Sequence, residues 1–246
     1  MKIAVAGGTG VVGKFTKQAL HQAGHQLEVL SRSNGVDLTT GVRLRERLAG
    51  CDAVIDCSNV NTMKRDVAVE FFTTVSRHLL EAGAQAGVRH FVALSIVGVD
   101  KVTFPYYAGK LAQEQVLLES GAPVTIQRAT QFHEFAAQLL ARTRKGPFAV
   151  VPRMLSQPVA AAEVGQRLAA LVVGEPLGRA VDFGGPQRLV MADLVRRYAA
   201  ALGQRVRVIS PPLPGMKGMA DGGLCLGPDG EQGRQTFAEW LALRHD

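Results

Sequence analysis

Short apolar runs alternate with longer segments of helical periodicity through the first half of the chain. The apolar runs predict strands at residues 3–6, 26–30, 53–56, 90–95 and 124–128. Between them, the spacing of apolar side chains predicts helices over residues 11–24, 64–87 and 105–120. This alternation favours parallel strands joined by right-handed crossovers, and uninterrupted apolar strands fit a sheet covered on both faces. We therefore predict an α/β protein built on a doubly wound parallel sheet.

The pattern of apolar positions changes after Thr130. There we expect helices over 131–145, 160–174, 191–202 and 237–243, an extended segment at 148–159, and strands at 179–183 and 206–209. Residues 210–230 are rich in glycine and proline, which predicts a long loop. The expected core comprises residues 1–130 and roughly 160–185 of a single domain. Residues from roughly 131 to 159, together with 186–246, would form a smaller C-terminal lobe.

A glycine-rich turn, Gly7-Gly8-Thr9-Gly10-Val11-Val12-Gly13, joins the first strand to the first helix. It contains the pattern G-x-G-x-x-G in the context that this pattern requires, directly after a strand and at the start of a helix. Glycines permit a tight turn, a close backbone approach to a pyrophosphate, and close packing of helix on strand. The helix N-terminus adds N–H groups and a partial positive charge. The turn therefore favours dinucleotide binding, and each of its residues, Gly7, Gly8, Thr9, Gly10, Val11, Val12 and Gly13, is a candidate contact.

The end of the second strand indicates which dinucleotide is bound. The chain there reads Ser31, Arg32 and Ser33, with no acidic residue to accept hydrogen bonds from a ribose 2′-hydroxyl. Arg32 and its serine neighbours can instead hold a 2′-phosphate, which favours NADP. NAD is possible too, because Arg32 can stack on adenine and Asp37 can act on either the ribose or the adenine.

Two further segments follow the carboxyl ends of predicted strands, where open sheets bind ligands. Ser58 and Asn59 follow the third strand and can contact cofactor ribose or phosphate, although an ordinary loop fits equally well. Gln131, Phe132 and His133 follow the fifth strand and are candidates for lining a substrate pocket. A structural role for the histidine is an equal alternative.

A Y-x-x-x-K pattern lies at the start of the third predicted helix. Tyr106 and Lys110 share one helix face, and Pro105 suits the first helical position. The helix terminus and the ammonium should both lower the pKa of the phenol, so that it can exchange a proton with a carbonyl compound. Ser95, at the end of the fourth strand, can hydrogen-bond the reacting oxygen. Tyr107 is a rival to Tyr106, because it also lies near the lysine.

Taken together, these motifs resemble the atypical short-chain dehydrogenase/reductases, and the NmrA-like NAD(P)-binding proteins most closely. The resemblance rests on the glycine turn, Tyr106-x-x-x-Lys110, and the segments 94–99, 128–132 and 233–241. It implies NAD(P)H bound to a Rossmann sheet, and a substrate cleft under the C-terminal lobe. It also implies that Lys110 holds the nicotinamide ribose, that Tyr106 is the acid or base, and that Ser95 orients the carbonyl.

Composition and charge indicate which partners, metals and cellular locations to expect for this protein. The net charge is +7, but the basic residues are dispersed, so we do not expect nucleic-acid binding. No apolar stretch approaches the ~20 residues of a membrane span, and the first apolar run is too short for a secretory signal, so we expect a cytoplasmic protein. Cys51, Cys57, Cys225 and the histidines lack metal-ligand spacing, so we expect no metal. Both a monomer and a homodimer are compatible with the sequence.

The sequence thus predicts an NADP(H)-dependent oxidoreductase. It would transfer hydride to or from a small carbonyl, quinone or enone-type substrate, with Tyr106, Lys110 and Ser95 as the catalytic residues. One alternative is a non-catalytic NAD(P)-sensing regulatory protein, and a third possibility is an NADP-dependent epimerase or isomerase. No motif in the C-terminal lobe identifies the substrate.

Overall fold

The computed structural model describes residues 1–243 of the chain, which divide into two compact units. Unit 1 comprises Met1–Ser95, Pro105–Arg128 and Ala162–Val181. Unit 2 comprises Ile96–Phe104, Ala129–Ala161 and the described residues from Asp182 onward. In this described part of the chain, no helix is long and apolar enough to cross a membrane.

Unit 1 is built on a parallel sheet with the strand order β9-β5-β4-β3-β1-β2. The strands are β1 Lys2–Ala6, β2 Gln26–Leu30, β3 Ala53–Asp56, β4 His90–Ile96, β5 Val124–Ala129 and β9 Gly178–Arg179. Strand β1 pairs in parallel with β2 on one side and with β3 on the other. The direction of winding therefore reverses between β1 and β3, and ligands bind at the carboxyl ends of strands at such a switch point.

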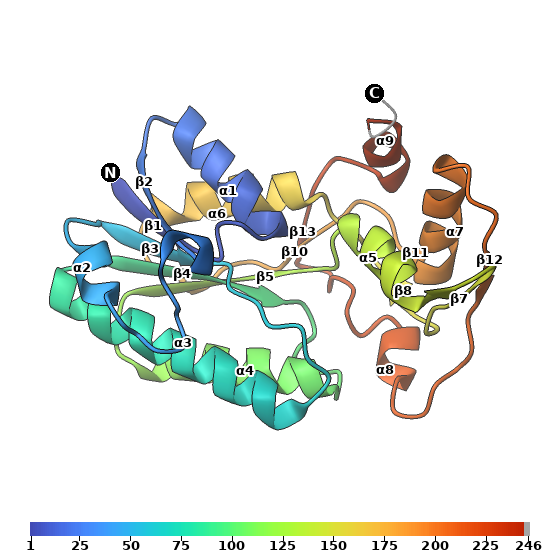
Figure 1. Cartoon of the computed structure of the whole chain (residues 1–246), viewed down its shortest axis with the longest axis horizontal. Coiled ribbons are helices and arrows are strands. Elements are labelled where there is room, and N and C mark those ends of the chain that lie inside the picture. Colours follow the sequence, from blue (N-terminus) through green and yellow to red (C-terminus); the bar gives the residue numbers. More distant parts are fainter. Residues whose placement is uncertain (244–246) are drawn as a thin grey trace. The chain divides into compact units, whose positions relative to one another are not determined.

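Helices cover both faces of this sheet, as the predicted doubly wound fold requires. Figure 1 shows α1 (Val11–Gln22) and α6 (Ala161–Val172) on one face, with α3 (Arg65–Ala86) and α4 (Pro105–Glu119) on the other. The helices of each pair touch closely. A Cβ atom on Gly109 of α4 would lie 2.7 Å from the backbone of Ala68 in α3, and one on Gly165 of α6 would lie 2.7 Å from the backbone of α1. The α/β fold class predicted from the sequence is confirmed.

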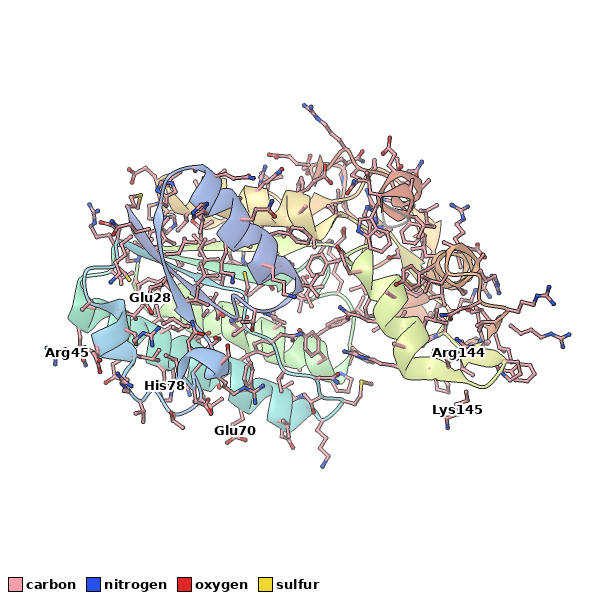
Figure 2. The ribbon with its side chains drawn as sticks, turned by 45° about the horizontal axis from the view of Figure 1, so that its top comes forward. Glu28, Arg45, Glu70, His78, Arg144 and Lys145 are labelled. Carbon is pink, nitrogen blue, oxygen red and sulfur yellow. The ribbon has the colours of Figure 1, made fainter. Side chains whose placement is uncertain are left out.

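Unit 2 combines short strands with four helices among its described residues. The helices are α5 Glu134–Thr143, α7 Met191–Ala201, α8 Lys217–Ala220 and α9 Phe237–Ala242. The strands are β6 Arg144–Lys145, β7 Phe148–Val150, β8 Leu155–Ser156, β10 Phe183–Gly184, β11 Leu189–Val190, β12 Arg207–Ile209 and β13 Glu231–Gln232. Strands β12, β7 and β6 form a small sheet, in which the exposed Arg144 and Lys145 (Figure 2) make up the outer strand.

Several short elements differ from the sequence prediction. The helix α2, Leu44–Leu48, is absent from the prediction, because five residues are too few to establish a periodicity. The expected strand at 179–183 is two separate short strands, β9 and β10. The expected helix at 131–145 begins only at Glu134. The segment 210–230 is not simply a loop, because it contains α8 and because Leu224 within it is completely buried.

Candidate active site

The glycine turn is compact, and two of its positions exclude any side chain. Gly7 has φ +70°, and a Cβ atom there would lie 2.5 Å from the carbonyl oxygen of Cys57. A Cβ atom on Gly13 would lie 2.3 Å from the carbonyl oxygen of Gly7. The N–H of Gly10 donates to that same oxygen at 2.9 Å, which closes the turn. The backbone of this turn is therefore held directly against the start of α1.

The start of α1 has the features of an anion site. Gly10 is the N-cap residue, and the first turn of the helix contains no acidic side chain. The first N–H groups of a helix have no partner within the helix, and they carry its positive end. Ser58 lies at the neighbouring end of β3, and its Oγ is buried without a hydrogen-bond partner among residues 1–243. A helix N-terminus with free N–H groups beside a buried hydroxyl that has no partner fits the diphosphate of a dinucleotide.

Arg32 directly follows β2 and lies near a turn in which Asp37 and Thr39 are hydrogen-bonded. The Oγ atoms of Ser31 and Ser33 lie 2.8 Å apart. Arg32 between them is exposed. The carboxylate of Asp37 accepts hydrogen bonds from the Thr39 hydroxyl at 2.7 Å and the Thr39 N–H at 2.9 Å, and these bonds lower the pKa of Asp37. The carboxylate of Asp37 thus accepts hydrogen bonds within its own turn, and the nearby charge of the exposed Arg32 lowers its pKa further.

Tyr106 lies in the first turn of α4, as predicted, but the pKa of its phenol is raised and not lowered. The hydroxyl donates a hydrogen bond to Oδ1 of Asn59 at 2.7 Å. The Tyr106 ring packs edge-on against Phe72 of α3, with the ring centroids 5.7 Å apart. Burial raises the pKa of Tyr106 above its usual value of 10. The expected lowering of this pKa is therefore wrong, because desolvation of the phenolate is the largest effect on it.

Lys110 is buried and does not act directly on the phenol. Its Nζ donates to the carbonyl oxygen of Leu94 and to Oε1 of Gln113, both at 2.9 Å. The same nitrogen lies 4.3 Å from the centroid of the Phe72 ring. Burial lowers the pKa of this lysine. In unit 1, Lys110 thus joins α4 to the end of β4, while the ring of Phe72 contacts both Lys110 and Tyr106.

Ser95 belongs to a buried ionic cluster. Its hydroxyl donates to Oε1 of Glu114 at 2.5 Å. Arg128 binds the same carboxylate through both ends of its guanidinium, at 2.8 and 2.7 Å, and Arg179 lies 3.4 Å from it. Because the proton of the Ser95 hydroxyl is committed to Glu114, this hydroxyl can accept a hydrogen bond but does not donate one elsewhere. A hydrogen bond between Ser95 and a reacting oxygen stays a prediction.

In unit 2, the expected pocket residue His133 is part of the interior. It is 1% exposed, and its Nε2 lies 3.1 Å from the carbonyl oxygen of Gln235. Its ring packs against Phe237 and Trp240 of α9, with centroid distances of 5.6 Å to each. These contacts favour the structural alternative for His133, and its place in a substrate pocket stays a prediction. The neighbouring Gln131 accepts a hydrogen bond from the Ser156 hydroxyl at 2.9 Å, and Phe132 bridges to Val159.

Sequence reasoning missed three residues of this site. Phe72 lies in the middle of a long helix, where an aromatic residue signals only a core position. Gln113 and Glu114 follow Lys110 by three and four positions, so they lie on the same side of α4. Two long polar side chains next to a lysine on one helix face could have been noticed, but their buried partners on other elements could not.

Among residues 1–243 there is no group of three or more His, Cys, Asp or Glu side chains that could hold a metal ion. Cys57 directly precedes Ser58 at the end of β3, and burial raises the pKa of its thiol to about 12. A thiol in this state is protonated at neutral pH and is a weak nucleophile.

A parallel sheet with a glycine turn at its switch point defines a protein of the NAD(P)-binding Rossmann class. A family model described as NAD(P)H-binding matches residues 7–172, more than half of the chain, so the chain belongs to this family. The chain is 28% identical over 226 residues to a (4-alkanoyl-5-oxo-2,5-dihydrofuran-3-yl)methyl phosphate reductase of Streptomyces griseus. That match covers 83% of this chain and 75% of the relative.

Several solved structures of nucleotide-dependent enzymes share this fold. A triphenylmethane reductase from Citrobacter sp., complexed with NADP(H), has a TM-score of 0.74 at 16% identity, with 99% of each chain covered. An NADPH-dependent quinone oxidoreductase from Escherichia coli has a TM-score of 0.73 at 14% identity, covering 99% of this chain and 100% of that one. A dTDP-glucose 4,6-dehydratase from Streptomyces venezuelae with bound NAD has a TM-score of 0.75 at 20% identity, covering 99% and 95%. The predicted NAD(P)-binding Rossmann fold and the NAD(P) class of cofactor are confirmed.

Proposed function

We propose that this protein is an NADP(H)-dependent reductase that transfers hydride to a small carbonyl, quinone or enone-type substrate. The observation that carries the proposal is the glycine turn, in which the missing Cβ atoms of Gly7 and Gly13 let the backbone close against the start of α1. When bound, the cofactor supplies a hydride at its nicotinamide ring. The turn, the helix N-terminus and the hydroxyl of Ser58 would hold its diphosphate.

The preference for NADP rests on Arg32. Arg32 is exposed and follows β2, with Ser31 and Ser33 on either side, while the carboxylate of Asp37 accepts its hydrogen bonds from Thr39. A guanidinium binds phosphate through charge-assisted hydrogen bonds, which contribute about 1.5–3 kcal/mol each. This corresponds to about 10- to 100-fold in affinity for the 2′-phosphate.

The proton for the reduced substrate would come from Tyr106. Its phenol is neutral at physiological pH, because burial raises its pKa, and it is oriented by a hydrogen bond to Asn59. A neutral phenol is a hydrogen-bond donor, which suits the direction of carbonyl or enone reduction. Lys110 and Ser95 would support the site through their buried contacts with Gln113 and Glu114.

The class of substrate is proposed from the names of relatives. The Streptomyces relative is named as the reductase of an alkanoyl-substituted dihydrofuranone, and the Escherichia coli structure as a quinone oxidoreductase. Quinones and such dihydrofuranones share a carbonyl conjugated to a carbon–carbon double bond. This shared chemistry places conjugated carbonyl compounds first in a substrate panel.

Calorimetric titration of the protein with NADPH and with NADH tests the cofactor proposal. We expect tighter binding of NADPH, and a 10- to 100-fold loss of NADPH affinity in Arg32→Ala with little change for NADH. Arg45→Ala is the matched control, because Arg45 on α2 (Figure 2) is an exposed arginine of the same unit. Equal affinity for both nucleotides in the wild type and in Arg32→Ala would overturn the NADP assignment.

A second candidate, an NAD(P)-sensing regulator without catalysis, is favoured by one observation. The phenol of Tyr106 has a raised pKa and no contact with the lysine ammonium that would activate it. Tyr106→Phe separates the two functions when NADPH oxidation is followed with a panel of quinones, enones and aldehydes. A large loss of turnover with intact NADPH binding supports the reductase. Binding without turnover in the wild type supports the sensor.

A further inference from the structure

A chain of hydrogen bonds in unit 1 leads from Lys110 to the loop after β3. Lys110 Nζ donates to Oε1 of Gln113 at 2.9 Å. Gln113 Nε2 donates in turn to Oδ2 of Asp56 at 2.8 Å. The other carboxylate oxygen of Asp56 accepts the backbone N–H of Ser58 at 2.8 Å. All four residues are buried, so these bonds fix the backbone of the loop up to the residue that precedes Asn59.

The loop then delivers one side chain to the phenol. Asn59 is exposed, and its Oδ1 accepts the hydrogen bond of the Tyr106 hydroxyl at 2.7 Å. An amide oxygen has no proton to give, so in this contact the phenol must be the donor and must carry its proton. Hydrogen bonding to the neutral form of an acid opposes its ionisation.

Direct action of the lysine charge on the phenol is not what the contacts show. The nitrogen of Lys110 lies over the Phe72 ring at 4.3 Å from its centroid, and the Tyr106 ring packs against the same Phe72 at 5.7 Å. The connection of Lys110 to Tyr106 by hydrogen bonds runs instead through Gln113, Asp56 and the loop.

We propose that Asn59 is a positioning residue for proton transfer, holding the hydroxyl of Tyr106 as an oriented, neutral donor. The Lys110–Gln113–Asp56 chain fixes the loop that carries Asn59. This inference rests on the proposed reductase function, in which Tyr106 gives its proton to the substrate.

The transfer conserves atoms and charge in the reductive direction. The substrate gains a hydride, with its electron pair, from the reduced nicotinamide cofactor, and a proton from the Tyr106 hydroxyl. The O–H bond of Tyr106 breaks as the new bond to the substrate forms, and water returns a proton to the phenolate. For this to happen, the phenol must turn its O–H from Oδ1 of Asn59 to the substrate, so Asn59 defines the starting orientation of the proton.

A double-mutant cycle with Asn59→Ala and Tyr106→Phe tests the coupling. If Asn59 acts through Tyr106, then Asn59→Ala should have a kcat at least about tenfold lower than the wild type. General acids contribute about 10²–10⁴-fold to the rate of a reaction. It should lower kcat hardly further when Tyr106 is already phenylalanine. KM for NADPH should change less than about twofold. Asn61→Ala is the matched control, because Asn61 is an exposed asparagine in the same loop and should leave kcat unchanged.

A titration of the protein without cofactor gives a readout that does not depend on activity. The chain has three tyrosines, so subtracting the tyrosinate absorbance of Tyr106→Phe isolates the signal of Tyr106. In the wild type, we expect Tyr106 to resist ionisation up to alkaline unfolding. In Asn59→Ala, its ionisation should begin at lower pH, because the neutral phenol has lost its acceptor.

The outcomes separate this inference from the proposed function. A Tyr106 titration that is the same in Asn59→Ala as in the wild type would overturn the inference, and so would additive losses of kcat in the cycle. A raised KM for NADPH with unchanged kcat would also overturn it, and would make Asn59 a cofactor contact. A wild-type protein that binds no NADPH would refute the proposed function, while the titration would still report the Asn59–Tyr106 contact.

Discussion

Adding a single methyl group at Gly13 should disrupt the glycine turn. In Gly13→Ala, the new Cβ would lie 2.3 Å from the carbonyl oxygen of Gly7 and 2.7 Å from Cα of Gly8, whereas ordinary contacts begin at 3.4 Å. Both neighbours are backbone, so no flexible side chain can move away. The turn and the first residues of α1 must separate by about 1 Å, because that distance restores ordinary contact. Such a shift would lengthen hydrogen bonds from backbone N–H groups to a diphosphate, and each hydrogen bond to a charged group contributes about 1.5–3 kcal/mol.

We therefore expect Gly13→Ala to bind NADPH about 100-fold more weakly, equivalent to about 2.7 kcal/mol of binding free energy. We also expect its free energy of unfolding to fall by about 1–3 kcal/mol, as is usual when a tightly packed site gains a methyl group. Calorimetry with NADPH measures the first change, and urea unfolding followed by circular dichroism measures the second.

Two alanine variants serve as comparisons. A Cβ on Gly10 would meet only the carbonyl oxygen of Gly7, at 3.2 Å, so Gly10→Ala should retain most of its stability while obstructing the pyrophosphate. A Cβ on Gly227 in unit 2 would have no neighbour within 4 Å. Gly227→Ala should therefore change neither the affinity for NADPH nor the free energy of unfolding. If Gly13→Ala bound NADPH as the wild type does, with the same stability, the turn would not be the binding element.

Three further predictions concern unit 1. Glu114→Gln should lower the free energy of unfolding in urea by about 3–5 kcal/mol, because Arg128 then lacks its buried counter-charge; a loss below about 1 kcal/mol would contradict this. Gly109→Ala should lower the free energy of unfolding in urea by about 1–3 kcal/mol, because its Cβ would lie 2.7 Å from the backbone of Ala68. A variant more stable than the wild type would contradict the close packing of α3 against α4. Burial lowers the pKa of His90 from 6.5, so below that pH the unfolded chain binds more protons than the folded one, and stability should rise with pH through this window and level off above it. Urea unfolding from about pH 5 to about pH 7 should show a smaller slope in His90→Gln, and an unchanged slope would exclude His90 as the cause.

The core of unit 1 was predictable because its signals are local. The apolar runs that become β1, β3 and β4 are nearly identical in the sequence prediction and in the structure. The glycine turn was predictable for the same reason, since contacts between residues a few positions apart decide where a Cβ atom fits. The short elements α2, α8 and β10 were not predicted, because they have neither a continuous apolar run nor enough residues to establish a helical periodicity.

What the sequence determined by itself is the order of strands and helices along the chain, the glycine turn between the first strand and the first helix, and the positions of Tyr106 and Lys110 on one helix. What only the tertiary structure decided is the state of those groups. Burial raises the pKa of Tyr106, and the hydroxyl of Tyr106 donates its hydrogen bond to Asn59, which comes from a different element. The contacts of Lys110 depend on Phe72, which lies 38 positions earlier in the chain. Desolvation and hydrogen bonding act over a few ångströms in space, so they are set by neighbours that only folding brings together.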